Sequence, residues 1–365
     1  MSVLRSLRPF GVAVLSLLGV ILGSPFSAHA EELILSGSSM LYPANREWAR
    51  GYERDHPGVR IRVKAPGSGA GITGTVEGDV SIGASDIFLS SRALAKKGNI
   101  VLIPVALEGV VPVVNLPSSF GRAPLRLDGP LLSRLLSGRI AFWDDPRLVR
   151  ENPGRFLPHL PVQPVVRADA SGTTYLLTDY LAHTCRWWQD NVGREPLPEW
   201  PRRAKVLAAR GSRALVEAVH AREGAIGYVG LGWLRRSKLL PVALKNDAGR
   251  TVSPSVMAIA KAARSTGGTM VFPDGFNRSL VGGGGDPGGW PVTGVEFWMV
   301  SPDLPEATMD RVRRLAVWVL TRGQAPAYTT ARGFVPLPDL PAGPRLMRRL
   351  KDVLPGNAFR PTTGG

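Results

Sequence analysis

The chain contains very little cysteine, because Cys185 is the only one among its 365 residues. One thiol excludes an intrachain disulfide framework and any metal site built from several cysteines. Histidine is also scarce, with five residues, and neither histidines nor carboxylates are grouped at the spacing of metal ligands. We therefore expect no metal and no other cofactor, and we expect Cys185 to be a buried structural thiol in a helical, partly apolar segment.

Long apolar runs are missing after the first 30 residues. Within them, Arg5 and Arg8 precede an apolar stretch that leads into Ala28-His29-Ala30. This order is typical of a secretory signal peptide, and its apolar core is shorter than the ~20 residues of a membrane-spanning helix. We expect cleavage near Ala30 and a mature protein that is periplasmic or secreted. We expect no lipid anchor, because the mature chain would begin with Glu31 and not with a cysteine.

Acidic residues are in the minority: 29 Asp and Glu stand against 45 Lys and Arg, which gives a net charge of +16. Such a balance favours anionic partners, and by itself it suits phosphate ions, nucleic acid or an anionic lipid surface. The cations are scattered, however, and aromatic residues are not interleaved with them as a base-stacking surface requires. We therefore predict no nucleic-acid partner.

Short apolar runs alternate with helical patterns along the mature chain. LILSG precedes PANREWARGYERD, and VRIRVKA precedes GITGTVEGD. Strand, turn and helix in repeated order predict an α/β fold with mostly parallel sheets. Ligands in such folds bind at the carboxyl ends of the strands.

Hydroxyl residues gather at three of these strand-to-helix junctions, beside glycine. Exposed N–H groups at a helix N-terminus suit a tetrahedral oxyanion. A lone hydroxyl at such a place is more often a simple helix cap. Three junctions in one chain, one of them next to Arg167, instead indicate an anion site. The hydroxyl residues are Ser38 and Ser39, then Ser68, and finally Ser171, Thr173 and Thr174.

Asp86, at the end of VSIGASD, is unusual in a chain that would bind an anion. Its carboxylate would repel a fully ionised ligand, but it could accept a hydrogen bond from an anion that still carries a proton. Phosphate carries such a proton at neutral pH and sulfate does not, so Asp86 could select phosphate. A turn or helix-capping aspartate is the structural alternative.

Seven segments of the chain match the segments of one known family in the same order. They are GSSMLYPANREWARGY, GSGAGITGTVEGDVSIGASD, LDGPLLSRLLSGRIAFWDDP, RADASGTTYLLTDYL, GAIGYVGLGW, GWPVTGVEFWMV and ARGFVPLP. Through them the chain resembles the PstS family, the periplasmic phosphate-binding proteins of the phosphate ABC transporter. This resemblance implies a type II periplasmic binding protein with two α/β lobes around a ligand cleft, joined by crossing strands. We expect residues 31–107 and 293–365 to form lobe 1, and residues 108–292 to form lobe 2.

The resemblance also implies roles for individual residues. Asp86 would accept the phosphate proton, Arg167 would pair with the anion, and Asp169 would hold that arginine in place. The remaining donors would be the hydroxyl or backbone groups of Ser68, Ser171, Gly172 and Thr173.

The first junction departs from the family pattern, which commonly has a threonine whose hydroxyl reaches the ligand. This chain has Met40-Leu41-Tyr42 there. Either the Ser39 hydroxyl substitutes, or the backbone N–H groups of Leu41 and Tyr42 suffice. One lost hydrogen bond to a charged ligand costs about 1.5 to 3 kcal/mol.

The expected function is capture of inorganic phosphate by a monomer that delivers it to ABC permease subunits, without catalysis. A binder of another oxyanion, or a phosphate sensor or scavenger, are alternatives on the same fold. A dinucleotide-dependent enzyme is a weaker alternative, suggested by the G-x-G-x-x-G of Gly69, Gly71 and Gly74. A secreted hydrolase is weaker as well, because no G-x-S-x-G motif surrounds the junction serines.

Overall fold

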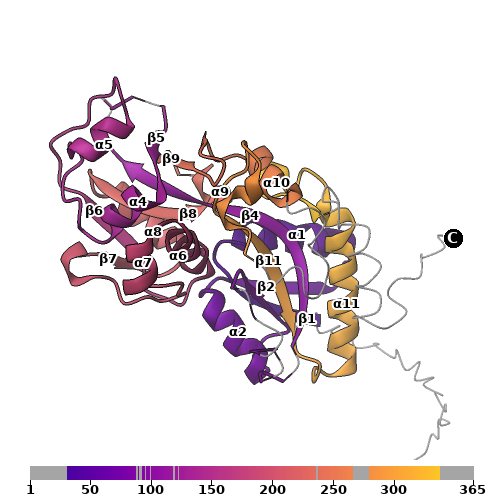
Figure 1. The fold of residues 1–365 in the computed structure, drawn as a ribbon. Helices are drawn as coiled ribbons and strands as arrows, with labels where there is room; N and C mark the ends of the chain where they lie inside the picture. Colours follow the sequence, from indigo (N-terminus) through magenta and orange to yellow (C-terminus); the bar gives the residue numbers. More distant parts are fainter. Residues whose placement is uncertain are drawn as a thin grey trace, which may run out of the picture.

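A computed structural model describes residues 31–87, 89, 93–94, 96–98, 100–117, 120–121, 123–235, 237–265 and 279–337. The predicted signal peptide, residues 1–30, lies outside the described residues, as does the predicted end of lobe 1 beyond residue 337. The fold consists of two α/β lobes (Figure 1). Within the described ranges, no helix is both long and apolar enough to cross a membrane.

Lobe 1 contains a sheet in the order β2-β1-β3-β11-β4. Strand β1 pairs in parallel with β2 and β3, whereas β11 runs antiparallel to both β3 and β4. Every residue of β3 and β11 is buried, which suits central strands covered on both faces. The elements of lobe 1 are β1 (Glu31–Gly37), α1 (Tyr42–Asp55), β2 (Val59–Lys64), α2 (Ser68–Glu77), β3 (Ile82–Ser85), β11 (Thr293–Val300), α11 (Glu306–Leu320), η5 (Arg322–Gln324) and η6 (Thr330–Arg332).

Lobe 2 continues the sheet in the order β4-β8-β6-β7, with β9 beside β4 and paired to β5 and β10. Its strands are β5 (Leu125–Leu127), β6 (Gln163–Arg167), β7 (Leu207–Ala209), β8 (Ala225–Gly230), β9 (Leu240–Lys245) and β10 (Thr251–Val252). Its helices are α4 (Gly129–Leu136), α5 (Pro146–Glu151), α6 (Gly172–Thr184), α7 (Arg186–Asn191), η2 (Arg202–Ala204), α8 (Gly211–His220), α9 (Leu231–Leu234), α10 (Val256–Arg264) and η4 (Val281–Gly285).

Strand β4 (Val101–Asn115) belongs to both lobes. Its first half pairs with β11, and its second half, from Val110 onward, pairs with β8. Figure 1 shows this long strand passing from one lobe into the other. The predicted boundary between residues 107 and 108 falls inside β4, and the lobe limits remain predictions.

The predicted α/β architecture is confirmed, but the expectation of mostly parallel sheets is wrong. The parallel pairs lie within each lobe, in β1 with β2 and β3, in β6 with β7 and β8, and in β5 with β9. Antiparallel pairs involve chiefly β4 and β11. Because β4 carries the chain from lobe 1 to lobe 2 and β11 brings it back, these two strands must run in opposite directions.

Cys185 is half-buried rather than buried. It ends α6 and precedes α7, and its position at this junction leaves part of the residue open to solvent. The prediction of a fully buried thiol is therefore wrong, although the residue does pack against the core.

Candidate functional site

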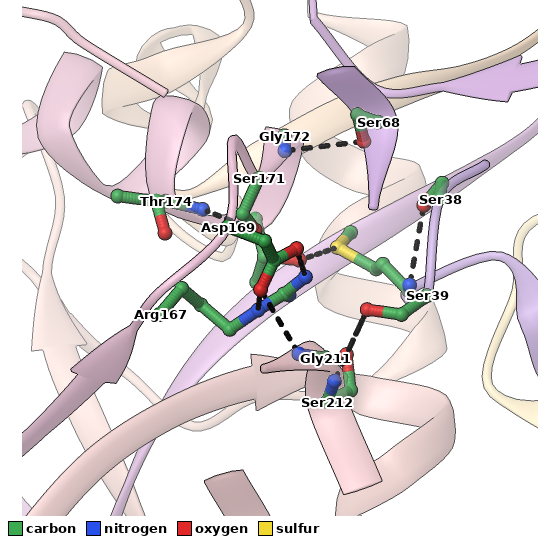
Figure 2. A network of polar contacts seen from close by, with 12 residues as sticks. Ser38, Ser39, Ser68, Arg167, Asp169, Ser171, Gly172, Thr174, Gly211 and Ser212 are labelled. Carbon is green, nitrogen blue, oxygen red and sulfur yellow. Dashed lines mark hydrogen bonds and ion pairs between the residues drawn. The ribbon is translucent and has the colours of Figure 1, made fainter. Parts of the chain in front are cut away.

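The three hydroxyl-bearing junctions meet where the two lobes face each other. Figure 2 shows Ser38, Ser39 and Ser68 from lobe 1 close to Arg167 and Ser171 from lobe 2. These positions follow from the fold, because β1, β2 and β6 each end at this interface and hand over to a helix. The chain thus brings together residues that are separated by more than a hundred positions in the sequence.

Ser68 links the two lobes through its hydroxyl group. It is the first residue of α2, its Oγ donates a hydrogen bond to Oδ1 of Asp86, and it accepts one from the backbone N–H of Gly172 at 3.1 Å. Asp86 follows β3 directly and is fully buried. A Cβ atom at Gly172 would collide with the Asp86 carboxylate, so only glycine allows this approach.

Arg167 is the last residue of β6, and its guanidinium is held by Asp169. Nε donates to Oδ1 at 2.9 Å and Nη2 donates to Oδ2, which is a bidentate pair with both side chains buried. The backbone N–H of Gly211 also donates to Asp169 Oδ1, at 2.9 Å. Because Asp169 holds one edge of the planar guanidinium group, the remaining N–H groups of Arg167 are pre-oriented for an oxyanion.

Tyr228 supports this arginine from β8. Its hydroxyl accepts a hydrogen bond from the backbone N–H of Arg167 at 3.1 Å and pairs with Thr174 Oγ1 at 2.8 Å. Burial raises the pKa of Tyr228 to about 12, so the phenol stays neutral. The sequence analysis missed Tyr228, which lies in the segment GAIGYVG.

The hydroxyls of the third junction have protein partners. Ser171 caps α6, because its Oγ accepts the N–H of Thr174 at 3.2 Å. The Thr173 hydroxyl donates to the Met40 sulfur at 3.4 Å, across the lobe interface. The structure therefore brings both residues to the site, and their predicted contact with a ligand remains a prediction.

The hydroxyl groups of the first junction also form hydrogen bonds within the protein. Ser38 Oγ accepts the backbone N–H groups of Met40 and Leu41 at 3.1 and 3.2 Å. Ser39 Oγ lies 2.8 Å from Ser212 Oγ and accepts the N–H of Ser212. Ser39 thus points toward the start of α8, and both the Ser39 hydroxyl and the Leu41 N–H are bonded within the protein. The expected contact of the Tyr42 N–H with a ligand remains a prediction.

Close packing accounts for two of the three glycines in the G-x-G-x-x-G pattern, Gly69 and Gly71. Gly69 donates its N–H to the carbonyl of Ala170 at 2.9 Å, and a Cβ atom on Gly69 would lie 2.5 Å from the Ala170 side chain. Gly71 packs against the backbone of Gly37, where an added Cβ atom would lie 2.8 Å from the Cα atom. These glycines let α2 pack closely against β1 and against lobe 2, so the pattern has a structural explanation without a dinucleotide.

Two further buried carboxyl groups, which the sequence reasoning missed, lie on the strands shared by the lobes. Glu108 on β4 faces Gly294, and Glu296 on β11 faces Ala106, so both point to the same face of the sheet. Ser85 pairs with Phe297, and continuing that register places Asp86 beside Glu296. The only sequence signal was a charged residue within an apolar run, VALEGVV and TGVEFWMV.

Burial raises the pKa of Asp86 and raises the pKa of Glu108 and Glu296 even further, because a charged carboxylate is costly away from water. A hydrogen bond from Ser68 partly offsets the effect for Asp86. Both oxygens of Glu296, and one each of Asp86 and Glu108, have no hydrogen-bond partner among the described residues. The floor of the site therefore holds three buried carboxyl groups of raised pKa near the buried guanidinium.

The donor set fits an oxyanion rather than a metal ion. Among the described residues, no group of three or more His, Cys, Asp or Glu side chains is arranged to hold a metal. The site instead combines a fixed guanidinium, a serine hydroxyl, helix N-termini and a carboxyl acceptor. Such a site can bind a tetrahedral anion that carries a proton.

Comparisons with known proteins concern the family and the fold of this chain. A model of a PBP superfamily domain matches residues 24 to 272. The phosphate-binding protein PstS of Xylella fastidiosa (strain Temecula1) is 32% identical over 321 residues, covering 87% of this chain and 83% of that protein. The phosphate-binding protein PstS of Haemophilus influenzae is 32% identical over 316 residues, covering 86% of this chain and 91% of that protein.

Solved structures show the same fold. The periplasmic phosphate-binding protein PfluDING, bound with phosphate, has a TM-score of 0.64 and 21% identity, covering 88% of this chain and 93% of that one. An ABC-type phosphate transport receptor from Vibrio cholerae has a TM-score of 0.54 and 16% identity, covering 83% of this chain and 99% of that one.

Proposed function

The chain belongs to the PstS family within the PBP superfamily, and from this premise we propose that it captures inorganic phosphate between its two lobes and delivers it to an ABC permease. The observation that carries the proposal is the arrangement of the Arg167–Asp169 pair opposite the Ser68–Asp86 pair, with Gly172 bonded to Ser68 across the lobes. Relatives with this name are solute-binding proteins, so binding without catalysis is the proposed activity.

The proposed binding mode replaces the water around phosphate with fixed protein donors. Stripping water from a dianion is costly unless every oxygen regains a partner, and the closed lobes supply partners from both sides. Arg167 would meet the charge, while Ser68 and the N–H groups at the start of α6 would donate hydrogen bonds. Asp86 would accept the proton of the bound anion and so disfavour sulfate.

Three finer points belong to the same proposal. After cleavage near Ala30, the protein would work in the periplasm or outside the cell as a monomer, and nucleic acid would not be a partner. Met40 and Leu41 would stand where the family commonly has a threonine, so affinity would be lower than with that hydroxyl present. Another oxyanion as ligand is the second candidate, favoured by the absence of a hydroxyl group at Leu41.

The test is calorimetric titration of purified, phosphate-stripped protein with phosphate and then with sulfate. We expect saturable binding of one phosphate per chain and a weak response to sulfate. The same titration of Arg167→Ala tests the role of this arginine. Arg322→Ala is its matched control, because Arg322 is exposed and pairs with Asp55 on the surface. Equal binding of both anions would contradict the role of Asp86, and no phosphate binding would contradict the proposal. Turnover of a chromogenic phosphate ester above background would contradict the non-catalytic role.

A further inference from the structure

A cavity lies beside the candidate site, and the hydrogen-bonded Ser39 and Ser212 are part of its lining. Its volume is about 280 Å³, at the small end of the range for ligand pockets. Figure 2 shows Ser39 and Ser212 at one end of the polar network and Ser68 and Gly172 at the other. We call this space the outer cavity; its lining includes Ser39, Tyr42, Lys64, Arg210, Arg213 and Trp233.

Three cations from two lobes converge on the outer cavity. Lys64 ends β2 in lobe 1, whereas Arg210 and Arg213 flank the first turn of α8 in lobe 2. No carboxylate is part of the lining, and within the described ranges none of the three cations has an ion-pair or hydrogen-bond partner. All three cations are exposed, whereas the buried Arg313 and the half-buried Arg332 have acidic partners.

The lobes are close together at this point. An added Cβ atom on Gly211 would lie 3.8 Å from the carbonyl oxygen of Ala65, the residue after Lys64. Bringing the lobes together therefore brings like charges together, which opposes closure unless an anion lies between them. Coulomb attraction to one anion would act on both lobes at once and favour the closed arrangement.

The rest of the lining suits a small phosphorylated molecule. The paired hydroxyls of Ser39 and Ser212 provide polar atoms at the inner wall. Tyr42 and Trp233 stack with ring centroids 6.4 Å apart and an interplanar angle of 13°, and they form an aromatic wall. Trp233 is fixed by a hydrogen bond of 2.7 Å from Nε1 to the carbonyl oxygen of Ser39.

We propose that the outer cavity is a second binding site, for a phosphoryl anion, separate from the Arg167 site. Lys64, Arg210 and Arg213 bind the phosphoryl oxygens, and the aromatic wall contacts any organic group attached to them. The bound anion links lobe 1 to lobe 2 and stabilises their closed arrangement. The source of the phosphoryl group is a free ion, such as phosphate or pyrophosphate, or a small phosphate monoester.

The test starts from Arg167→Ala, which removes the guanidinium of the inner site and leaves the outer cavity intact. Pyrophosphate is titrated by calorimetry at low ionic strength. We expect one molecule to bind per chain, and the combined change Arg210→Ala and Arg213→Ala to weaken binding at least tenfold. Arg202→Ala with Arg203→Ala is the matched control, because both arginines are exposed, lie in the same lobe and are absent from the lining.

An alternative form of the protein and one further variant keep the titration decisive. If Arg167→Ala does not fold, the parent protein with its inner site saturated by phosphate serves instead, and a second equivalent is titrated. Lys64→Gln tests the opposite lobe, and we expect it to weaken binding as well. Loss of binding in the control variant to the same extent as in the test variant, or no pyrophosphate binding at all, would overturn the proposal.

Titrations with different ligands identify the source of the phosphoryl group. Tighter binding of phenyl phosphate than of phosphate would assign the site to a monoester in contact with Tyr42 and Trp233. Tighter binding of pyrophosphate would assign it to a polyvalent ion. Since the outer cavity is measured with the inner site disabled or filled, failure here leaves the proposed capture of phosphate at Arg167 untouched.

Discussion

Replacing Glu296 with glutamine should make the protein more stable at neutral pH. Glu296 is fully buried on β11, neither of its carboxyl oxygens has a hydrogen-bond partner among the described residues, and burial raises its pKa well above the usual range. The carboxyl group therefore keeps its proton in the folded protein at a pH where the unfolded chain has released it. Glutamine has nearly the same shape and is never charged.

The sign and size of the effect follow from proton linkage. Below the pKa of about 4.3 in the unfolded chain, both states are protonated and the stability is fully present. As the pH rises from there toward the higher pKa of the folded state, each such group lowers the free energy of unfolding by about 1.4 kcal/mol per pH unit. Glu108 adds its own loss, because burial raises its pKa in the same direction.

We expect Glu296→Gln and the parent to be similar near pH 4.5 and to diverge as the pH rises. The variant should gain about 1.4 kcal/mol over the parent for each pH unit in which Glu296 stays protonated only in the folded state, against a typical total of about 5 to 15 kcal/mol. The measurement is urea unfolding of phosphate-free protein, followed by tryptophan emission between pH 4.5 and 7.5. Glu77→Gln is the control, because Glu77 is exposed at the end of α2. Parallel pH profiles for Glu296→Gln and the parent would refute the reasoning.

Three further predictions concern ligand binding. Arg167→Ala should weaken phosphate binding by at least ~100-fold in calorimetry, because it removes two charge-assisted hydrogen bonds of about 1.5 to 3 kcal/mol each; unchanged affinity would contradict its role. Asp86→Asn should reduce the preference for phosphate over sulfate by at least ~10-fold in competition titrations, since an amide no longer repels an unprotonated anion. A preserved preference would argue against Asp86 as the proton acceptor. Leu41→Thr should tighten phosphate binding by about one to two decades if the added hydroxyl reaches the ligand, and an unchanged Kd would show that it does not.

Local patterns predicted the α/β class of the fold and an anion site at the junctions, and the resemblance to the PstS family implied that the junctions meet between two lobes. Arg167, Asp169 and Gly172 lie within a single strand-to-helix turn, so their arrangement depends mainly on neighbouring residues. The carboxyl ends of parallel strands share one edge of a sheet, which brought Ser68 and Asp86 to the same place. The structure adds the distances between these groups, while their contacts with a ligand remain predictions.

The buried glutamates could not be predicted in this way. Glu108 and Glu296 become neighbours only because β4 and β11 pair antiparallel in one particular register, and a shift by one residue would turn a strand's side chains to the opposite face. The direction of Ser39 depends likewise on contact with Ser212 in the other lobe. Both features arise from tertiary pairing between distant segments, on which local sequence patterns carry no information.

The position of β11 has a consequence for the order in which the protein can be completed. β11 lies between β3 and β4 in the sheet of lobe 1, yet the ribosome produces it after every strand of lobe 2. Until then, the nascent lobe 1 has a gap at the centre of its sheet, with the edges of β3 and β4 unpaired there. Domains generally fold as units during synthesis, and here the lobe that is begun first is finished last. The amino-terminal part of the chain thus stays incompletely folded until synthesis is nearly over, a state in which a chain can still be threaded across a membrane.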